Sequence, residues 1–268
     1  MCSRLTGCPA VALLLSLSSC GGRALPTPRD APVIVPGQTH AAMQIVEVSG
    51  FEVLEVILGD PEDDEAVPLI VALHGRGGQA VWPQPVLLGL PVSVRVAVIR
   101  GPIASGGGFG WFDLHYGSAS DEQMVEAIGT VTDRLAVAVN ALIARRPTSG
   151  KAIVYGFSQG GALAFGLAVR HGNIVGAAFP CAAWFPSELV PVPMTAPAAP
   201  IHALHSRDDS VIPVGAARGA VEGLRVSRVS AELHEFDGAG HMMSAEMDAQ
   251  LHEWLGDAVT RAYGDPPI

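Results

Sequence analysis

Short apolar runs alternate along this chain with longer segments whose apolar residues recur at helical spacing. Continuous apolar runs rich in β-branched residues are typical of strands buried on both faces of a sheet. The run 69–73 (LIVAL) is the clearest example, and 94–99 is similar. The other predicted strands are 43–48, 51–58, 152–155, 174–179, 201–205 and 231–236.

The helical segments lie between these strands. Residues 121–145 carry apolar side chains on one helical face, and Asp121 is the predicted N-cap. Further helices are expected from about 159 to 171, at 213–226 after a proline, and at 242–263. Strands and helices in this alternation predict an α/β fold with a mostly parallel central sheet, helices on both faces and right-handed crossovers. No long insertion separates the elements, so no large lid is expected.

The first forty residues are expected to lie outside this domain. Residues 1–19 resemble a lipoprotein-type signal peptide, with an apolar core over 9–19 that is too short to span a bilayer. Cys20 then stands where a bacterial lipoprotein would be lipidated, and 20–40 form a proline-rich tether. The α/β domain would therefore cover 41–268. An ordinary signal cleaved nearby, for example after Ala24, or a misassigned start codon is the alternative.

Charge and cysteine content narrow the possibilities. The formal net charge of −10 argues against nucleic acid as a partner, because phosphate binding requires a basic face. Of four cysteines, two would leave with the signal and Cys20 would carry lipid. Cys181 would then be alone, which precludes a disulfide within the mature chain and predicts a small buried residue. The expected location is the cell envelope, with a lipid anchor in the membrane, or alternatively secretion.

The most informative motif is Gly156-x-Ser158-x-Gly160, which follows a predicted strand and opens a predicted helix. In that setting G-x-S-x-G forms a sharp turn that projects the serine hydroxyl above the sheet. The glycines leave room where a Cβ atom would collide. A glycine-rich turn with an idle serine is the alternative interpretation of the motif alone.

A nucleophilic serine needs a base and an orienting carboxylate, which on this fold follow in the order serine, acid, histidine. Asp208 and Asp209 come directly after the strand 201–205, and His241 comes after the strand 231–236. Each alone could be a solvated turn or a helix-entry residue. Three candidates in the required order, each after a strand, favour catalysis.

The chain resembles the phospholipase/carboxylesterase group of α/β-hydrolases, which includes acyl-protein thioesterases. The resemblance rests on five segments, LHGRGG at 73–78, WFD at 111–113, GFSQGGALA at 156–164, H-x-x-x-D-x-VIP at 205–213 and G-x-GH at 238–241. It implies an α/β-hydrolase fold and a serine esterase that needs no cofactor and acts on small ester substrates. The chain departs from the family at Ser206, where a glycine is usual.

The resemblance also assigns roles to residues of this sequence. It implies that Ser158 is the nucleophile, Asp209 the acid and His241 the base. The backbone N–H groups of Gln159 and Arg76 would form the oxyanion hole. Hydrolysis of short to medium acyl esters is the leading hypothesis. The alternatives are an acyl thioesterase or lysophospholipase with the same triad, or a non-catalytic envelope lipoprotein that uses the fold for binding.

Two pairs of aromatic residues are candidates for the substrate site. Trp111 and Phe112 follow a glycine-rich segment that is expected to be a mobile loop, and Trp184 and Phe185 follow the strand after the serine motif. These side chains either line the acyl site or pack beneath their loops. His74 and His205 are predicted to be structural, and no His/Cys/Glu spacing in the sequence suggests a metal site.

Overall fold

The computed structural model describes residues 41–263, apart from 82–83 and 192–196, together with residue 265. The described residues all belong to one compact unit. The predicted signal peptide over 1–19, the tether over 20–40 and the lipidation site at Cys20 lie outside the described residues. They stay predictions.

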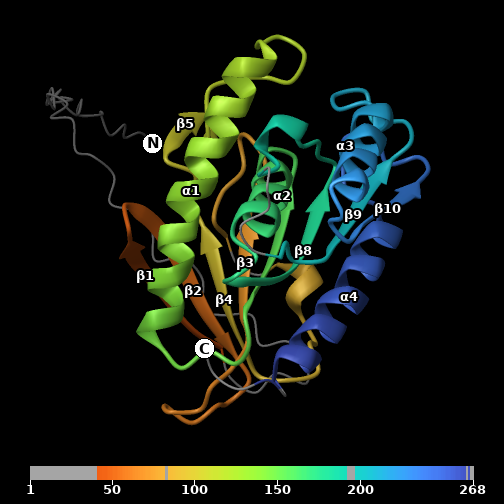
Figure 1. Cartoon of the computed structure of the whole chain (residues 1–268). Coiled ribbons are helices and arrows are strands. Elements are labelled where there is room, and N and C mark those ends of the chain that lie inside the picture. Colours follow the sequence, from red (N-terminus) through yellow and green to blue (C-terminus); the bar gives the residue numbers. More distant parts are fainter. Residues whose placement is uncertain (1–40, 82–83, 192–196, 264, 266–268) are drawn as a thin grey trace, which may run out of the picture. The chain divides into compact units, whose positions relative to one another are not determined.

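Eight of the described strands form one sheet (Figure 1), in the spatial order β1-β2-β4-β3-β7-β8-β9-β10. β1 and β2 are antiparallel to each other, β2 is antiparallel to β4, and the neighbouring pairs from β4 to β10 are parallel. The mostly parallel sheet is therefore confirmed. The strands are β1 Ala41–Val48, β2 Phe51–Leu58, β3 Leu69–Leu73, β4 Val94–Ile99, β7 Ala152–Phe157, β8 Val175–Cys181, β9 Ile201–Ser206 and β10 Ala231–Phe236.

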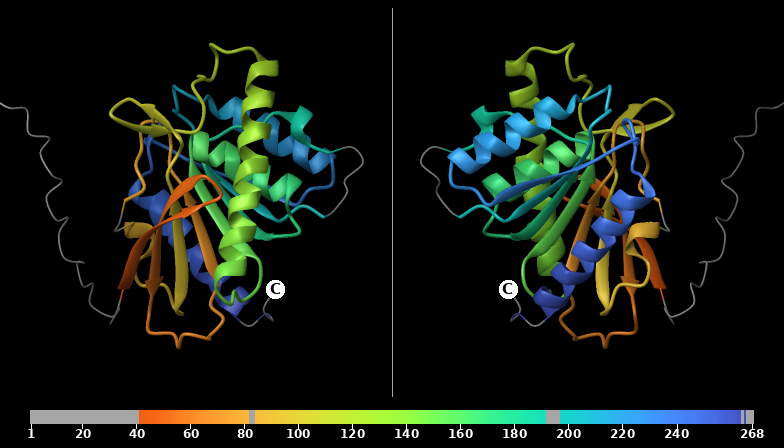
Figure 2. Two further views of the ribbon diagram at one scale, coloured as in Figure 1. Left: turned by 90° about the vertical axis from the view of Figure 1, so that its left-hand side faces the viewer. Right: turned by 90° about the vertical axis from the view of Figure 1, so that its right-hand side faces the viewer.

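Helices cover both faces of this sheet (Figure 2). One apolar core joins the sheet to α1 (Asp121–Arg145), α2 (Gln159–Arg170) and α3 (Val214–Val226). A second core, on the opposite face, joins it to α4 (Ala245–Tyr263) and the short 3₁₀ helix η1 (Pro85–Leu87). The central strands β3 and β4 are buried throughout, as their continuous apolar sequences predict. Cys181 is buried, as predicted.

Most predicted element boundaries agree with the structure to within a few residues, and three details differ. The N-cap of α1 is Ser120, not Asp121: its hydroxyl accepts from Gln123 N while the Gln123 side chain accepts from Ser120 N. α4 begins at Ala245, three residues later than expected. A second 3₁₀ helix, η2 (Ser187–Leu189), lies in a segment that the sequence indicated only as a loop.

The glycine-rich segment before Trp111 contains two short strands and is not the irregular loop that was expected. It forms a hairpin of β5 (Ile103–Ser105) and β6 (Gly108–Gly110). Phe109 of this hairpin exchanges backbone hydrogen bonds with Gly77 and Gly78 in the loop after β3. Gly108 permits this close approach, because a Cβ atom there would collide with the carbonyl oxygen of Gly77. The hairpin therefore braces one wall of the region above the sheet.

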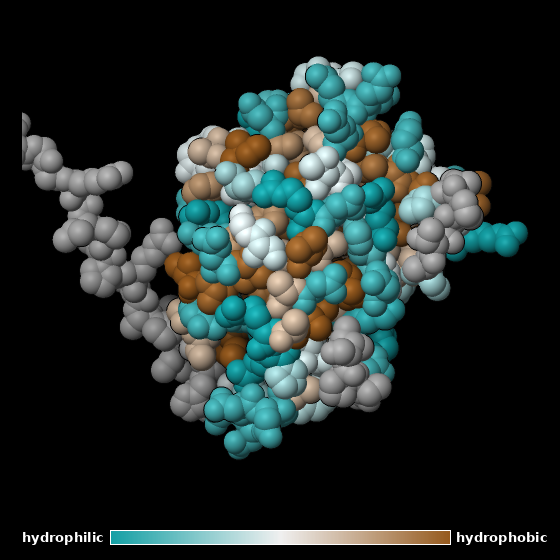
Figure 3. All heavy atoms as spheres, turned by 60° about the vertical axis from the view of Figure 1, so that its left-hand side comes forward, coloured by the Kyte–Doolittle hydropathy of each residue, from teal (hydrophilic) through white to brown (hydrophobic). Residues whose placement is uncertain are grey.

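Helix α1 is, by length and composition alone, apolar enough to cross a membrane. Its buried side chains, which include Ile128, Leu135 and Leu142, belong to the first apolar core, so α1 is a core helix of the domain. Apolar and polar side chains are mixed over the face of the molecule drawn in Figure 3. On β1, at the edge of the sheet, Ile45 is 66% exposed.

Candidate active site

Ser158 occupies the turn between β7 and α2 in a strained backbone conformation. Its φ of 53° and ψ of −116° lie in a region that residues with a Cβ atom rarely adopt. The backbone N–H of Ser158 donates to Cys181 O at 2.9 Å, which ties the turn to β8. A Cβ atom on Gly156 would collide with Gly160 O, and one on Gly160 with Leu73 O. The two glycines thus allow the sharp turn that lifts Ser158 above the sheet.

The structure brings Ser158, His241 and Asp209 into one hydrogen-bonded chain. His241 Nε2 lies 3.0 Å from Ser158 Oγ, and His241 Nδ1 lies 2.7 Å from Asp209 Oδ2. The residues follow the carboxyl ends of β7, β9 and β10; β9 and β10 are neighbours in the sheet, and only β8 separates β7 from β9. In this arrangement Nδ1 donates to the carboxylate, so Nε2 is free to accept the serine proton.

The side chain of Asp209 is fully buried, and its carboxylate is well compensated. Oδ1 accepts from the backbone N–H groups of Val211 and Ile212, each at 2.9 Å, while Oδ2 faces His241. A buried carboxylate is tolerated only where such donors replace its hydration. His205 contributes to the same turn, since its Nε2 lies 2.8 Å from Ile212 O and 3.4 Å from Asp209 Oδ2. This geometry agrees with a structural role for His205.

Asp208 points to a different loop from that of Asp209. Its carboxylate accepts from the backbone N–H groups of Gly238 and Gly240 at 3.0 and 3.3 Å, and from the hydroxyl of Ser206. Ser206 Oγ in turn accepts from Ala239 N at 3.2 Å. The hydrogen bond from Ser206, followed by those from the backbone, lowers the pKa of Asp208. Together Ser206 and Asp208 hold the turn that leads into His241.

His74 is a structural histidine, as the sequence predicted. Its Nδ1 lies 2.7 Å from Gly75 O, and the backbone N–H of Gly101 donates to its Nε2 at 2.9 Å. This pattern requires a neutral ring with its proton on Nδ1. Burial lowers the pKa of His74, which favours the same neutral form. His74 thereby joins the loop after β3 to the segment after β4.

Arg76 and Gln159, the predicted oxyanion-hole residues, both line the cavity in front of Ser158. They lie close together across Gly110, where a Cβ atom would be 3.3 Å from Gln159 Oε1 and 3.7 Å from Arg76 Cγ. Gln159 is the first residue of α2, where backbone N–H groups are unpaired and favour negative charge. The structure thus brings both residues next to Ser158, and their role as oxyanion-hole donors stays a prediction.

The side chain of Gln159 has a second task that the sequence did not indicate. Its Oε1 accepts from Trp111 N at 3.1 Å, and its Nε2 donates to Phe112 O and Leu114 O at 3.0 and 3.3 Å. These bonds fasten the segment 111–114 to the serine turn. A polar residue next to the serine of the motif was the available signal, but its partners are 45 to 48 positions away.

A cavity of about 330 Å³ lies beside Ser158 and His241. Of the four aromatic residues predicted to line it, Phe112 and Trp184 do so. Trp111 and Phe185 do not, and this correction has a packing reason. Trp111 is 1% exposed and donates from Nε1 to His74 O, whereas Phe185 is 2% exposed and stacks on Phe165 of α2. The remaining wall, which sequence reasoning missed, comprises Leu114, His115, Tyr116, Met124, Phe157, Ala162, Val211 and Ile212.

The sequence of this chain was compared with those of known protein families. Residues 60–256 match the family described as Phospholipase/Carboxylesterase, and this range is well over half of the chain. The chain belongs to the phospholipase/carboxylesterase family. The resemblance inferred from the five sequence segments is therefore confirmed.

A curated relative and several solved structures agree with this family. The relative is a probable inactive carboxylesterase from rice (Oryza sativa subsp. japonica), 25% identical over 159 residues, which are 57% of this chain and 64% of the rice protein. The match thus spans slightly less than two thirds of that relative.

The solved structures share the α/β-hydrolase fold at low identity. Esterase PE8 is 20% identical, with a TM-score of 0.64, and the match covers 81% of this chain and 99% of that one. A Bacillus cereus carboxylesterase is 17% identical, with a TM-score of 0.61 and coverages of 77% and 94%. Zea mays acyl-protein thioesterase 2 is 20% identical, with a TM-score of 0.56 and coverages of 84% and 100%.

The cavity residues that sequence reasoning missed come from segments that lie far apart in the chain and meet only in the fold. Tyr116 packs edge-on against Trp184 with ring centroids 5.2 Å apart, which joins the segment before α1 to the segment after β8. Met124 reaches the same wall from the first turn of α1. Helical periodicity marked Met124 as a core residue, and nothing in that pattern distinguishes a core position from a cavity wall.

Proposed function

We propose that this protein is a serine hydrolase that cleaves carboxylic esters of short to medium acyl chains. The observation that carries the proposal is the continuous path from Ser158 Oγ through the two ring nitrogens of His241 to Asp209, with separations of 3.0 and 2.7 Å. A serine hydroxyl is a weak nucleophile until a positioned base removes its proton. In this proposal His241 is that base.

Acylation would begin with attack of Ser158 Oγ on the carbonyl carbon of the ester. The serine proton passes to His241 Nε2, and the carbonyl oxygen becomes an oxyanion. Asp209 stabilises the imidazolium and keeps its Nδ1 proton directed at the carboxylate. The backbone N–H groups of Arg76 and Gln159 would receive the oxyanion, where one such donor is worth roughly 10²–10³ in kcat.

The tetrahedral intermediate then collapses. The bond between the carbonyl carbon and the alcohol oxygen breaks, and His241 returns its proton to the leaving alcohol. The acyl group stays on Ser158 as an ester. A water molecule, deprotonated by His241, attacks that acyl ester, and a second collapse releases the carboxylic acid and restores the Ser158 hydroxyl. The cycle uses no cofactor.

The cavity supports an acyl chain of limited length. Its volume of about 330 Å³ is at the lower end of the usual range for small-molecule sites, roughly 300–1,000 Å³. Its lining is mainly aromatic and aliphatic, with Phe112, Met124 and Trp184 around the serine. Each buried methylene contributes roughly 0.8 kcal/mol only while it has wall to contact. A short or medium chain gains all of this, whereas a long chain extends into water.

The decisive experiment is labelling of the folded protein with a fluorophosphonate probe, followed by mapping of the adduct by mass spectrometry. We expect one adduct, on Ser158, and none in a Ser158→Ala variant of equal fold. Reaction at another serine, or none in protein whose circular dichroism is native, would refute the mechanism. The last result would favour the binding-module alternative. The rice relative, which is described as a probable inactive carboxylesterase, is a reason to test this alternative.

The same three residues could also serve a thioesterase or a lysophospholipase. The likeness to an acyl-protein thioesterase fold is the observation that favours this second candidate. The two candidates differ in leaving group and chain length and not in the position of Ser158. Turnover of matched oxygen and thiol esters of one acyl chain separates ester from thioester preference, while a chain-length series separates both from long-chain lipid substrates.

We further propose that the enzyme acts at the cell envelope, held by a lipid on Cys20. The support is the apolar run 9–19 followed by Cys20 and a proline-rich stretch. A lipid anchor would place the catalytic domain close to a membrane surface and leave its small ester substrates in the surrounding solution.

A further inference from the structure

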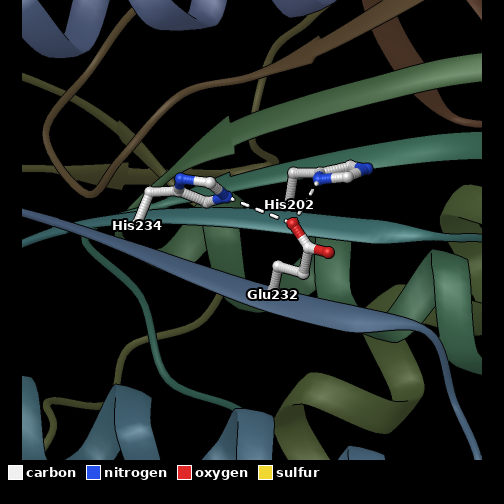
Figure 4. A group of neighbouring side chains, drawn as sticks. All are labelled: His202, Glu232 and His234. Carbon is white, nitrogen blue, oxygen red and sulfur yellow. Dashed lines mark hydrogen bonds and ion pairs between the residues drawn. The ribbon is translucent and has the colours of Figure 1, made fainter.

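Three side chains away from the proposed catalytic residues converge on one point at the edge of the sheet (Figure 4). His202 lies on β9, and Glu232 and His234 lie on the edge strand β10. Glu232 is the register partner of His202, and His234 is two residues further along the same strand. Since successive side chains alternate between the faces of a sheet, all three project from the same face. That face is the one covered by α4, because Leu204 of β9 packs there.

The separations of their polar atoms are close to those of ligands that share one metal ion, and the contact between His234 and Glu232 is also a long hydrogen bond. His202 Nδ1 lies 3.5 Å from Glu232 Oε2, and His234 Nε2 lies 3.3 Å from the same oxygen. Nitrogen–oxygen hydrogen bonds are usually about 2.7–3.2 Å. Two ligand atoms held tetrahedrally at about 2.0–2.1 Å from Zn²⁺ are about 3.3–3.4 Å apart. All three ligand atoms lie within 4.8 Å of one another.

Aromatic side chains hold the two imidazoles in place. Trp254 of α4 lies edge-on to His234, with ring centroids 4.6 Å apart, and 5.4 Å from the ring of His202. Phe179 of β8 stacks against His202 at 6.0 Å. Fixed rings reduce the entropy that a metal ion must overcome to gather its ligands.

We propose that His202, Glu232 and His234 form a binding site for Zn²⁺, with water completing a tetrahedral coordination. Two imidazoles and one carboxylate form a ligand set that Zn²⁺ commonly accepts. The acidic net charge of the chain, −10, favours cations in general. Arg261 of α4 lines a cavity together with His202 and is a nearby positive charge. It is not one of the three residues of the cluster.

The site is separate from the catalytic residues. His202 and Glu232 are the second residues of β9 and β10, whereas Asp209 and His241 follow the opposite, carboxyl ends of these strands. Glu232 is exposed and both histidines are partly exposed, so an ion can reach the cluster from solvent. A bound Zn²⁺ would join β10, the edge strand, to β9 and resist its fraying. Its expected effect is therefore on stability and not on ester turnover.

The test uses the tag-free full chain after treatment with EDTA and dialysis. Calorimetric titration with ZnCl₂ should give one Zn²⁺ per chain, and thermal unfolding should move to a higher Tm when Zn²⁺ is present. His202→Asn combined with His234→Asn should weaken binding by roughly tenfold or more and abolish the rise in Tm. Glu232→Gln, which keeps the shape of the side chain, should lower affinity in the same direction.

Two controls separate this site from other histidines. His171→Asn changes a partly buried histidine that pairs with Asp133 at 2.8 Å, and it should leave the titration unchanged. Ser158→Ala with His241→Asn should also retain full binding, since those residues lie at the other end of the strands. Failure of wild-type protein to bind Zn²⁺, or equal binding by the His202/His234 variant, would overturn the proposal. Loss of binding in the Ser158/His241 variant would place the ion at the catalytic residues and overturn it as well.

Discussion

Asp208 and Asp209 are adjacent in the chain, yet their carboxylates bind different partners on the loop after β10. Asp209 Oδ2 lies 2.7 Å from His241 Nδ1, whereas Asp208 accepts from the backbone of Gly238 and Gly240. Asp209 is buried, and Asp208 lies in a more exposed part of the turn. One carboxylate is thus placed to orient the imidazole, and its neighbour holds the backbone that carries that imidazole.

This division predicts unequal effects for two matched substitutions. Asp209→Asn should reduce kcat by about 10⁴, because an amide cannot hold the His241 tautomer that accepts the serine proton. Asp208→Asn retains hydrogen-bonding capacity on a partly solvated turn and should cost far less. Steady-state kinetics on a soluble ester, with circular dichroism of both variants, measures the difference. The reverse ranking would show that Asp208 is the acid.

Removal of the nucleophile or the base should have a similar, large effect. Ser158→Ala and His241→Ala are each expected to lower kcat by about 10⁴ or more, since the members of such a group act as a unit. Both side chains lie at the cavity surface, so the fold should survive their truncation. Turnover within tenfold of wild type in either folded variant is incompatible with the proposed chemistry.

Acyl-chain preference should follow the limited cavity. With p-nitrophenyl esters, kcat/KM should peak at about four to eight carbons, because longer chains gain no further apolar contact. Trp184→Ala should enlarge the cavity and shift the optimum towards longer chains, while Trp111→Phe, in the core, should alter stability without such a shift. A steady rise out to sixteen carbons would favour a lysophospholipase or depalmitoylating enzyme.

The Gln159 side chain offers a test of how the cavity wall is held. Gln159→Met keeps the backbone N–H but removes three hydrogen bonds to residues 111, 112 and 114. Because buried backbone groups lose their partners, the free energy of unfolding should fall by roughly 2 kcal/mol or more. KM should rise as the wall loosens. Urea unfolding and kinetics of the same preparation measure both, and unchanged values for both would exclude this bracing role.

Localisation can be tested in cells. Full-length protein should fractionate with membranes, and Cys20→Ala should release it or stall its processing, because the substitution removes the thiol that would carry the lipid. The matched control is Cys8→Ala within the predicted signal, which should leave fractionation unchanged. Soluble wild-type protein that begins near Leu25 would instead indicate plain secretion.

The sequence predicted most of the fold because its strands and helices carry local, periodic signals. The run at 69–73 is apolar throughout and becomes the fully buried β3, and the alternation of strands and helices implies a parallel sheet. The hairpin of β5 and β6 was missed because its short glycine-rich strands have no apolar period. It is held by backbone hydrogen bonds to Gly77 and Gly78, which no local pattern records.

The chemical identities of the site also followed from sequence, since Ser158, Asp209 and His241 each occur in a recognisable motif after a predicted strand. Tertiary structure decided which aromatic residues face the cavity. Trp111 and Trp184 have similar sequence surroundings, yet one donates to His74 O within the core and the other lines the cavity. Side-chain direction in a loop depends on long-range partners and has no period to reveal it.

The cluster of His202, Glu232 and His234 is a second feature that the sequence determined only in part. Motif spacing detects ligands that a single turn or helix brings together, whereas here the ligands come from two strands 30 positions apart. The composition of each strand was evident from the sequence, and so was the alternation that puts Glu232 and His234 on one face. Only the register of β9 against β10 decided that His202 would meet them, because register is set by how the whole sheet packs.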